Sequence, residues 1–144
     1  LLLMLGHGLC SSGLFALANI IYERSHSRSL FINKGFLVFM PSMTMFWFLF
    51  SINNMASPPS LNLLGEIFLI NSVLSWSSIT WIFIAFSSFL SCCYSIYLYS
   101  ITQHGVLYSG LKCNLGGCVR EYILLFFHFL PLNLLFLDMN LFIL

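Results

Sequence analysis

The stretch Leu61-Asn62-Leu63-Leu64-Gly65-Glu66-Ile67-Phe68-Leu69-Ile70 sets one carboxylate into a run of apolar residues. Glu66 is also the only formally charged residue between Lys34 and Lys112. If this run lies in a lipid bilayer, an acidic side chain at mid-depth costs about 2.5 to 3.5 kcal/mol on insertion scales. Residues that bear such a cost typically act on an ion or a proton, so Glu66 is the first candidate for function.

The composition indicates an integral membrane protein. Of the 144 residues, 60% are hydrophobic, 17% are aromatic and only 6% are charged, whereas about a quarter of the residues in soluble globular domains are charged. A water-soluble protein of this composition could not cover its surface with polar groups. The formal net charge of +1 provides neither a basic patch nor an acidic tail. We therefore expect the lipid bilayer as a partner and no nucleic acid.

Five stretches approach the length of about 20 residues that a bilayer crossing requires. They predict an all-α polytopic transmembrane helical bundle with about five membrane spans, at 1–21, 35–52, 61–76, 79–101 and 122–137. Aromatic residues lie at both ends of the fourth span. Tyr97 follows Trp81 by 16 residues, or about 24 Å of helix, which fits aromatic belts at the two faces of one bilayer.

Prolines mark the starts of the second and third spans. Pro41 predicts a kink near the start of the second span. Before the third span, Ser57 is the expected N-cap and Pro58 is suited to the first helical turn. A helix that begins at Pro58 would place Glu66 about 12 Å from that end, well inside an apolar layer about 30 Å thick.

Alternation of five spans predicts which connections share a side of the membrane. Arg24, Arg28 and Lys34 would lie on one side with the C-terminal tail, and Lys112 and Arg120 on the other. Because the two groups are nearly equal in size, the sequence alone shows no marked charge asymmetry between the two sides.

The surroundings of Glu66 offer an amide but no cation. Asn62 lies one helical turn earlier on the same face, where it could hydrogen-bond the carboxyl or hold a water beside it. None of the five spans carries a Lys or Arg. Glu66 is therefore either neutral for much of the time or paired with a cation from outside this chain. The alternative is a protonated Glu66 that merely bridges helices.

His7 is the second candidate, on the first span. Ser11 lies one turn further on, within hydrogen-bond reach of the imidazole. Two faces of small residues along this span favour close helix packing: Gly8, Ser12 and Ala16 on one, and Gly6, Cys10 and Gly13 on the next. A histidine titrates near neutral pH, so His7 could relay protons. Equally, it could simply bond a neighbouring helix.

No motif for a metal ion or a nucleotide is visible. Cys92 and Cys93 are adjacent and point to different helix faces, and Cys113 and Cys118 lack the paired two-residue spacing of zinc sites. The chain has no Gly-rich phosphate loop and no dinucleotide fingerprint. We expect no metal and no bound nucleotide in this segment. Leu1 is not a start methionine, so we also expect the segment to belong to a longer polytopic protein.

Several short motifs occur in an order that resembles one protein family. They are Gly6-His7-Gly8-Leu9-Cys10-Ser11-Ser12-Gly13, Ala18-Asn19, Tyr22-Glu23-Arg24, Ser27-Arg28, Met40-Pro41, Pro58-Pro59, Asn62-Leu63-Leu64-Gly65-Glu66, Gln103-His104-Gly105, Arg120-Glu121 and His128-Phe129-Leu130-Pro131-Leu132-Asn133-Leu134-Leu135. Each is weak alone, but in order they cover nearly the whole chain. Together they resemble the chain 4 family of mitochondrial NADH-ubiquinone oxidoreductase, in a form similar to insect members.

The resemblance implies the last five helices of an antiporter-like subunit in the membrane arm of respiratory complex I. Residues 1–144 would be the C-terminal part of a single proton-translocating domain. Glu66 matches an acidic residue in the exit half of the family's proton route, and His7 matches a histidine of the buried polar axis. Asn62 and Ser11 are the polar residues expected to support them. The family's essential glutamate and lysines on earlier helices have no counterpart here.

The function that the resemblance implies is proton translocation across the inner mitochondrial membrane, coupled by the whole complex to electron transfer from NADH to ubiquinone. No cofactor is expected in this segment, because NADH, FMN, the iron-sulfur clusters and ubiquinone would bind elsewhere in the complex. The expected partners are other membrane-arm subunits, with protons as the only small substrate. Two alternatives remain open: a secondary cation/proton antiporter, which shares the midplane carboxylate, and a purely structural membrane subunit.

Overall fold

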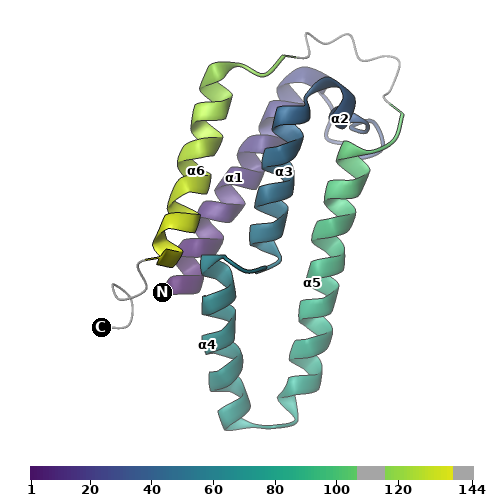
Figure 1. The fold of residues 1–144 in the computed structure, drawn as a ribbon. Coiled ribbons are helices and arrows are strands. Elements are labelled where there is room, and N and C mark those ends of the chain that lie inside the picture. Colours follow the sequence, from purple (N-terminus) through teal and green to yellow (C-terminus); the bar gives the residue numbers. More distant parts are fainter. Residues whose placement is uncertain (107–115, 138–144) are drawn as a thin grey trace.

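The computed structural model describes residues 1–106 and 116–137, and every regular element in these ranges is a helix. The helices are α1 (Leu2–Ser25), α2 (Phe36–Phe39), α3 (Pro41–Asn54), α4 (Leu61–Trp76), α5 (Thr80–Gln103) and α6 (Val119–Leu137) (Figure 1). The predicted all-α helical class is therefore confirmed. Lys112 and Cys113 lie outside the described residues.

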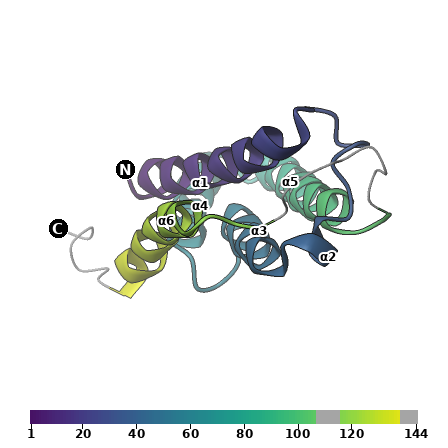
Figure 2. The same ribbon diagram turned by 90° about the horizontal axis from the view of Figure 1, so that it is seen from above.

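Helix α1 packs closely because one of its faces carries small residues. Gly6, Cys10 and Gly13 are buried on this face, and their spacing of three or four residues keeps them on one side of an α-helix. At Gly13 a Cβ atom would overlap the ring of Phe50 on α3, so only glycine permits this contact. Seen from above in Figure 2, α1 runs along one side of the bundle, next to α6 and α3.

The hydrophobic core lies mainly between α1, α3 and α6. Its buried members are Cys10, Leu17, Ile20, Ile21, Phe36, Met40, Met43, Trp47, Phe50, Leu125 and Leu132. The rings of Phe50 and Phe129 meet edge to face with centroids 6.1 Å apart, a geometry that aromatic pairs prefer. The other predicted small-residue face is only partly packed within the described chain, where Ala16 contacts the core. Gly8 and Ser12 on that face are exposed, and the space beside Gly8 is open.

The second predicted span is interrupted where the sequence predicts only a kink. Met40, between α2 and α3, adopts φ −136° and ψ 66°. This conformation is not helical, because a residue that precedes proline is disfavoured in the α region. Pro41 then begins α3, at a position where its missing N–H leaves no helical hydrogen bond unmade.

Helix α4 has the limits of the predicted third span, 61–76, but Ser57 and Pro58 do not have the predicted roles at its start, for the same reason. Pro58 precedes Pro59, so it is disfavoured in the helical conformation that a first turn requires. Helix α4 instead begins at Leu61, and Ser60 is its N-cap. The Ser60 hydroxyl accepts a hydrogen bond from the N–H of Leu63 at 3.3 Å, so Ser60 takes the role predicted for Ser57.

Helices α3 and α4 run in the same direction, one after the other, beside α5. The Thr44 hydroxyl near the start of α3 donates to Oε1 of Gln103 at the end of α5, at 2.9 Å. Helix α4 is joined to the start of α5 by the turn at 77–79, as Figure 1 shows. With 14 and 16 residues, the two helices are each only about 21 to 24 Å long, less than a hydrocarbon layer of about 30 Å. Together they form one crossing, broken at residues 55–60.

This broken crossing changes the number of spans and the sides on which the charges lie. Helices α1, α5 and α6 are each long and apolar enough to cross a membrane, and α3 with α4 supplies a fourth crossing in place of two of the five predicted spans. Nη2 of Arg24 at the end of α1 lies 2.7 Å from Oε2 of Glu121 at the start of α6. The prediction that Arg24 and Arg120 lie on opposite sides is therefore wrong. Pro58 and Pro59 mark a break within a crossing, not a turn outside it.

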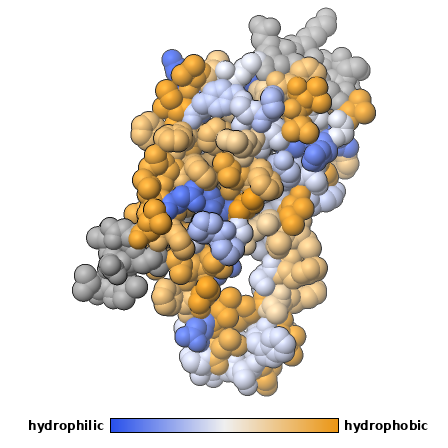
Figure 3. All heavy atoms as spheres, viewed as in Figure 1, coloured by the Kyte–Doolittle hydropathy of each residue, from blue (hydrophilic) through white to orange (hydrophobic). Residues whose placement is uncertain are grey.

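The outer surface of the bundle suits a lipid environment. Apolar side chains cover most of the face shown in Figure 3. On α5, Phe83, Phe86 and Phe89 are 71%, 65% and 64% exposed, and Trp76 and Trp81 are exposed at the end where α4 meets α5. Soluble proteins rarely expose so much contiguous apolar surface. These helices are therefore suited to contact lipid or other membrane helices, with the tryptophans at the membrane face.

Candidate functional site at the broken crossing

The first turns of α1 and α4 pack against each other beside the break. A Cβ atom on Gly6 would overlap Oδ1 of Asn62, and a Cβ atom on Gly65 would lie 2.8 Å from the α1 backbone. Each glycine thus allows a close approach of the two helices, as small residues do in membrane bundles. The contact brings the helix that carries His7 against the helix that carries Glu66.

Glu66 is half-buried on α4, near the middle of the predicted membrane layer. It precedes Trp76, the last residue of α4, by 10 residues, or about 15 Å of helix. Because tryptophans favour the membrane face, Glu66 is about half-way through a layer of about 30 Å. It is not about 12 Å from a helix start at Pro58, as the sequence predicts. Within residues 1–106 and 116–137, its carboxyl makes no hydrogen bond or ion pair.

Asn62 makes a different hydrogen bond from the one predicted. Its Nδ2 donates to the backbone oxygen of Asn53 on α3 at 2.9 Å, and the direct bond to the Glu66 carboxyl is not formed. Its Oδ1 points at Gly6 and has no hydrogen-bond partner in the described chain. Asn62 therefore links the two helices across the break.

His7 is exposed on α1 and lines a cavity of about 360 Å³ between α1, α3 and α5. Ser11 lines the same cavity, but its hydroxyl donates to the Gly8 carbonyl at 3.2 Å. The predicted bond to the imidazole is therefore not formed, because a serine within a helix often bonds the preceding turn instead. The remaining polar residues of the cavity lining are Ser51, Asn54, Tyr94 and Ser95.

Sequence reasoning did not single out the polar residues that α3 and α5 contribute to this cavity. Ser51 and Asn54 are three residues apart, so a helix places them on one face, and Ser95 completes the lining from α5. The Ser51 hydroxyl donates to the Trp47 carbonyl at 2.7 Å, which leaves its oxygen able to accept. The three-residue spacing of Ser51 and Asn54 is the signal that could have identified them, but it requires a second span that extends past residue 52 to Asn54.

The structure brings His7 and Glu66 onto touching helices but not into one cavity. Glu66 is not among the residues that line the His7 cavity. The contact between Gly6 and Asn62 lies beside His7 and one helical turn before Glu66. His7 and Glu66 are therefore related by a contact between their helices and not by a shared cavity.

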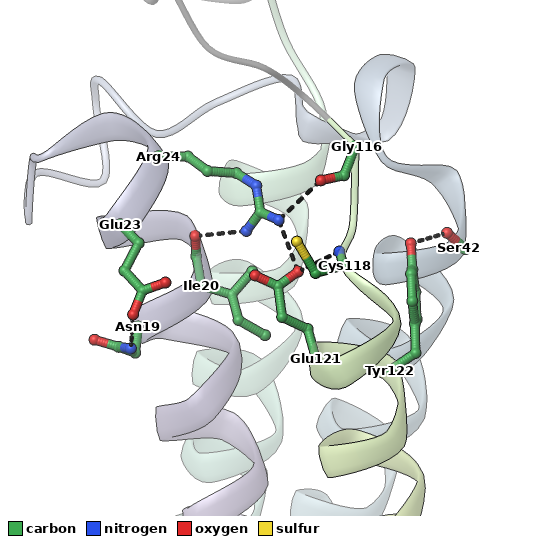
Figure 4. A network of polar contacts seen from close by, with 9 residues as sticks. All are labelled: Asn19, Ile20, Glu23, Arg24, Ser42, Gly116, Cys118, Glu121 and Tyr122. Carbon is green, nitrogen blue, oxygen red and sulfur yellow. Dashed lines mark hydrogen bonds and ion pairs between the residues drawn. The ribbon is translucent and has the colours of Figure 1, made fainter.

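A second polar cluster joins α1 to α6 at one end of the bundle (Figure 4). The Arg24 guanidinium pairs with Glu121 and donates to the carbonyls of Ile20 and Gly116 at 2.9 and 3.0 Å. Glu121 also accepts from the N–H of Cys118 at 2.9 Å. The two charged side chains are only 10% and 17% exposed. Since both charges are paired and further hydrogen-bonded, this cluster holds helices together rather than offering a reactive group.

A known protein family matches the part of the chain that contains His7 and Glu66. Residues 1–91, which include α1, the broken crossing and the first half of α5, match the profile of the NADH:quinone oxidoreductase/Mrp antiporter transmembrane family. The chain belongs to this antiporter family. The matched segment contains both His7 and Glu66.

The curated relatives of this antiporter-family chain share one name, NADH-ubiquinone oxidoreductase chain 4. The protein from Ceratitis capitata is 64% identical over 135 residues, which is 94% of this chain and 30% of the relative. The protein from Locusta migratoria is 61% identical over 134 residues, 92% of this chain and 30% of the relative. The protein from Anopheles arabiensis is 59% identical over 138 residues, 96% of this chain and 62% of the relative. The predicted resemblance to insect members of the chain 4 family is confirmed, and the chain spans less than two thirds of each of these relatives.

The remaining thiols and acids of this antiporter-family chain form no metal site in the part that the structure describes. No group of three or more His, Cys, Asp or Glu residues gathers there, and Cys10, Cys92, Cys93 and Cys118 are free thiols. The expectations that this segment binds no metal and no cofactor stay predictions.

Proposed function

We propose that this chain is the C-terminal part of a chain 4 subunit of NADH-ubiquinone oxidoreductase, respiratory complex I, in the inner mitochondrial membrane. In this proposal it takes part in proton translocation coupled to electron transfer from NADH to ubiquinone. The family match, the names of the relatives and the exposed apolar helices support it. Its partners are other membrane-arm subunits, and the reaction of the complex is that of a proton-translocating NADH:ubiquinone reductase.

The contact of α1 with α4 at the break is the observation that carries the roles of individual residues. It places His7 and Glu66 on touching helices, with Glu66 about half-way through the membrane layer. A mid-membrane carboxyl without an ion-pair partner in the described chain is free to gain and lose a proton, and an imidazole has two ring nitrogens that can each bind or release one. Glu66 and His7 are therefore the proton-carrying residues of the proposal. Asn62 and Ser11 are not given a supporting role in it, because they hydrogen-bond Asn53 and Gly8 instead.

The redox chemistry belongs to other parts of the complex. NADH, FMN, the iron-sulfur clusters and ubiquinone are proposed to bind outside this chain, whose own substrate is the proton. A cation that balances Glu66 would come from another helix of the subunit or from a neighbouring subunit, because none of the five spans predicted from the sequence carries a Lys or Arg.

The test is Glu66→Gln in the assembled complex. Gln keeps the size and hydrogen bonding of a neutral carboxyl but cannot exchange a proton. We expect normal assembly and a loss of NADH-driven proton uptake of about 100-fold, the lower end for a proton-transfer group. Uptake is measured in vesicles and normalised to complex content. Glu66→Asp should be intermediate, since its carboxyl titrates but is withdrawn by one methylene.

Glu23→Gln is the matched control, because Glu23 is exposed at the end of α1 and accepts from Asn19 at 2.9 Å. It should pump normally. Unchanged uptake in Glu66→Gln would make Glu66 a structural carboxyl and would favour the scaffold alternative. Purification of the chain without flavin and iron-sulfur clusters, yet with cation-driven proton exchange, would instead favour a free cation/proton antiporter.

A further inference from the structure

A cavity of about 170 Å³ lies at the end of the bundle where α1 leads into α2 (Figure 1). Arg28 and Asn33, from the connection between these helices, line it together with Trp47 on α3 and Thr102 on α5. Neither of the proposed proton-carrying residues lines this cavity. What it binds is therefore a separate question from the proton route.

Asn33 brings a buried acceptor without a partner to this cavity. Only 7% of the residue is exposed. Its Nδ2 donates to the backbone oxygen of Ser27 at 2.9 Å, which fixes the amide. Its Oδ1 has no hydrogen-bond partner in the part of the chain that the structure describes. Because buried polar groups nearly always have a partner, Asn33 indicates a hydrogen-bond donor from outside the described chain.

Arg28 brings a positive charge to the same cavity. Its guanidinium lies 5.5 Å from the centroid of the Tyr22 ring, and no carboxylate pairs with it within residues 1–106 and 116–137. Arg28 and Leu30 are exposed, so the cavity is accessible on this side. Helix α1 ends at Ser25, and the connection that follows is at the membrane face, where the phosphate groups of lipids lie. Guanidinium groups are well suited to bind phosphate.

Together, the two side chains select a ligand that carries both an anionic group and a hydrogen-bond donor. Water would satisfy Asn33 but would leave Arg28 without a counter-charge. In phosphoethanolamine, the phosphate can pair with Arg28 while the ammonium donates to Oδ1 of Asn33. A choline group has no N–H to donate. Trp47 adds an aromatic ring to the lining, and aromatic rings attract ammonium groups.

The size of the cavity agrees with this chemistry. Its volume of about 170 Å³ equals that of about six waters in the liquid. That space accommodates the short ethanolamine group, with the phosphate at Arg28 on the exposed side. We propose that this cavity binds the headgroup of phosphatidylethanolamine.

The binding test uses the complete complex and a phosphatidylethanolamine with a photoreactive group on an acyl chain, close to the glycerol. We expect mass spectrometry to find the label on residues 22–35. Unlabelled phosphatidylethanolamine should compete about tenfold better than phosphatidylcholine, because only the first can donate a charged hydrogen bond to Asn33. Phosphatidylglycerol should also compete more weakly. Equal competition by either of these two lipids would overturn the proposal.

Asn33→Leu and Asn33→Asp form a matched pair of variants. Both lose the bond to Ser27, and only Asp keeps an acceptor. In the assembled complex, Leu should lower the labelling about tenfold and Asp should keep it. Equal labelling in the two variants would overturn the proposal. If neither variant assembles, the competition between lipids in the unchanged complex still decides.

Arg28→Gln tests the phosphate contact. It should also lower the labelling about tenfold, because it removes a charge-assisted hydrogen bond. Arg120→Gln is the matched control, since Arg120 is exposed at the same end of the bundle but does not line the cavity. It should leave the labelling unchanged, and equal losses in the two variants would reduce the site to a general attraction of lipid by positive charge and would overturn it.

A cryo-electron-microscopy map of the complete complex gives an independent readout. We expect headgroup density in contact with the guanidinium of Arg28 and within hydrogen-bond distance of Oδ1 of Asn33. A protein side chain in the cavity, or waters alone, would overturn the proposal.

Discussion

The two polar regions of this bundle differ in whether their charged and polar atoms have partners. At the α1–α6 end, Arg24 and Glu121 pair at 2.7 Å, and each makes further hydrogen bonds to the backbone. At the break, Glu66 has no partner within the described residues, and Asn62 keeps an unpaired oxygen. Saturated polar groups rigidify a structure, whereas an unsatisfied one has an unused capacity to bind or exchange. The Arg24–Glu121 pair is therefore a clamp that holds α1 to α6, whereas the break is a candidate functional site.

His7→Ala is expected to change proton uptake more than any other substitution that tests this comparison. We expect proton uptake per complex to fall by about 100-fold, because a relay cannot lose its titrating group. Assembly should be nearly normal, since the His7 side chain is exposed in the described chain. NADH-driven uptake and the amount of assembled complex are measured together. His104→Ala, in an exposed loop, is the control, and poor assembly with normal uptake per complex would make His7 a packing residue.

A packing effect of intermediate size is expected at the contact of α1 with α4. Gly65→Ala would place a Cβ atom 2.8 Å from the α1 backbone, and overpacking of this kind costs about 1 to 3 kcal/mol. We expect a lower amount of assembled complex on native gels and a lower midpoint of thermal inactivation.

Gly8→Ala is the matched control for this change, because a Cβ atom at Gly8 meets nothing within 4 Å in the described chain. The change should be neutral or should stabilise the helix by about 0.5 to 1 kcal/mol. Equal effects of the two alanines would show that α1 and α4 are not in close contact at Gly65.

The smallest effect is expected at the clamp. Arg24→Gln and Glu121→Gln should each lower the midpoint of thermal inactivation of the complex without changing proton uptake per complex. Because the two side chains are in contact, the double variant should be less harmful than the sum of the singles, with a coupling of about 1 kcal/mol. Strictly additive effects would mean that the ion pair does not hold α1 to α6. A loss of uptake would place the clamp within the proton route.

Much of the helical architecture was predictable from the sequence because apolar length is a local property. The limits of α4 agree with the predicted third span, and α5 covers the fourth. The error concerned Pro58 and Pro59, which carry the same local signals whether a chain turns at the membrane surface or breaks within it. Only the pairing of α5 with both α3 and α4 distinguishes the two cases, and that pairing depends on contacts between distant residues.

The candidate site was predictable to a different extent. Glu66 and His7 stand out because ionisable groups are rare in this sequence, and their proposed roles stay predictions. Ser51, Asn54 and Ser95 were missed because hydroxyl and amide residues are frequent here, and Ser51 and Ser95 bond within their own helices. The orientation of Asn62 could not be predicted, since it depends on Gly6, which lies on another helix.

The broken crossing also decides where the positive charges of the chain collect. Arg24, Arg28, Lys34 and Arg120 all belong to the connections at the clamp end, whereas the turn at 77–79 carries no charge. Short loops rich in Lys and Arg stay on the side from which a membrane protein is inserted. We therefore expect the clamp end to face the compartment from which the chain is inserted, and the turn at 77–79 to face the opposite side of the membrane. The break at residues 55–60 thus adds Arg120 to the side that already has Arg24, Arg28 and Lys34.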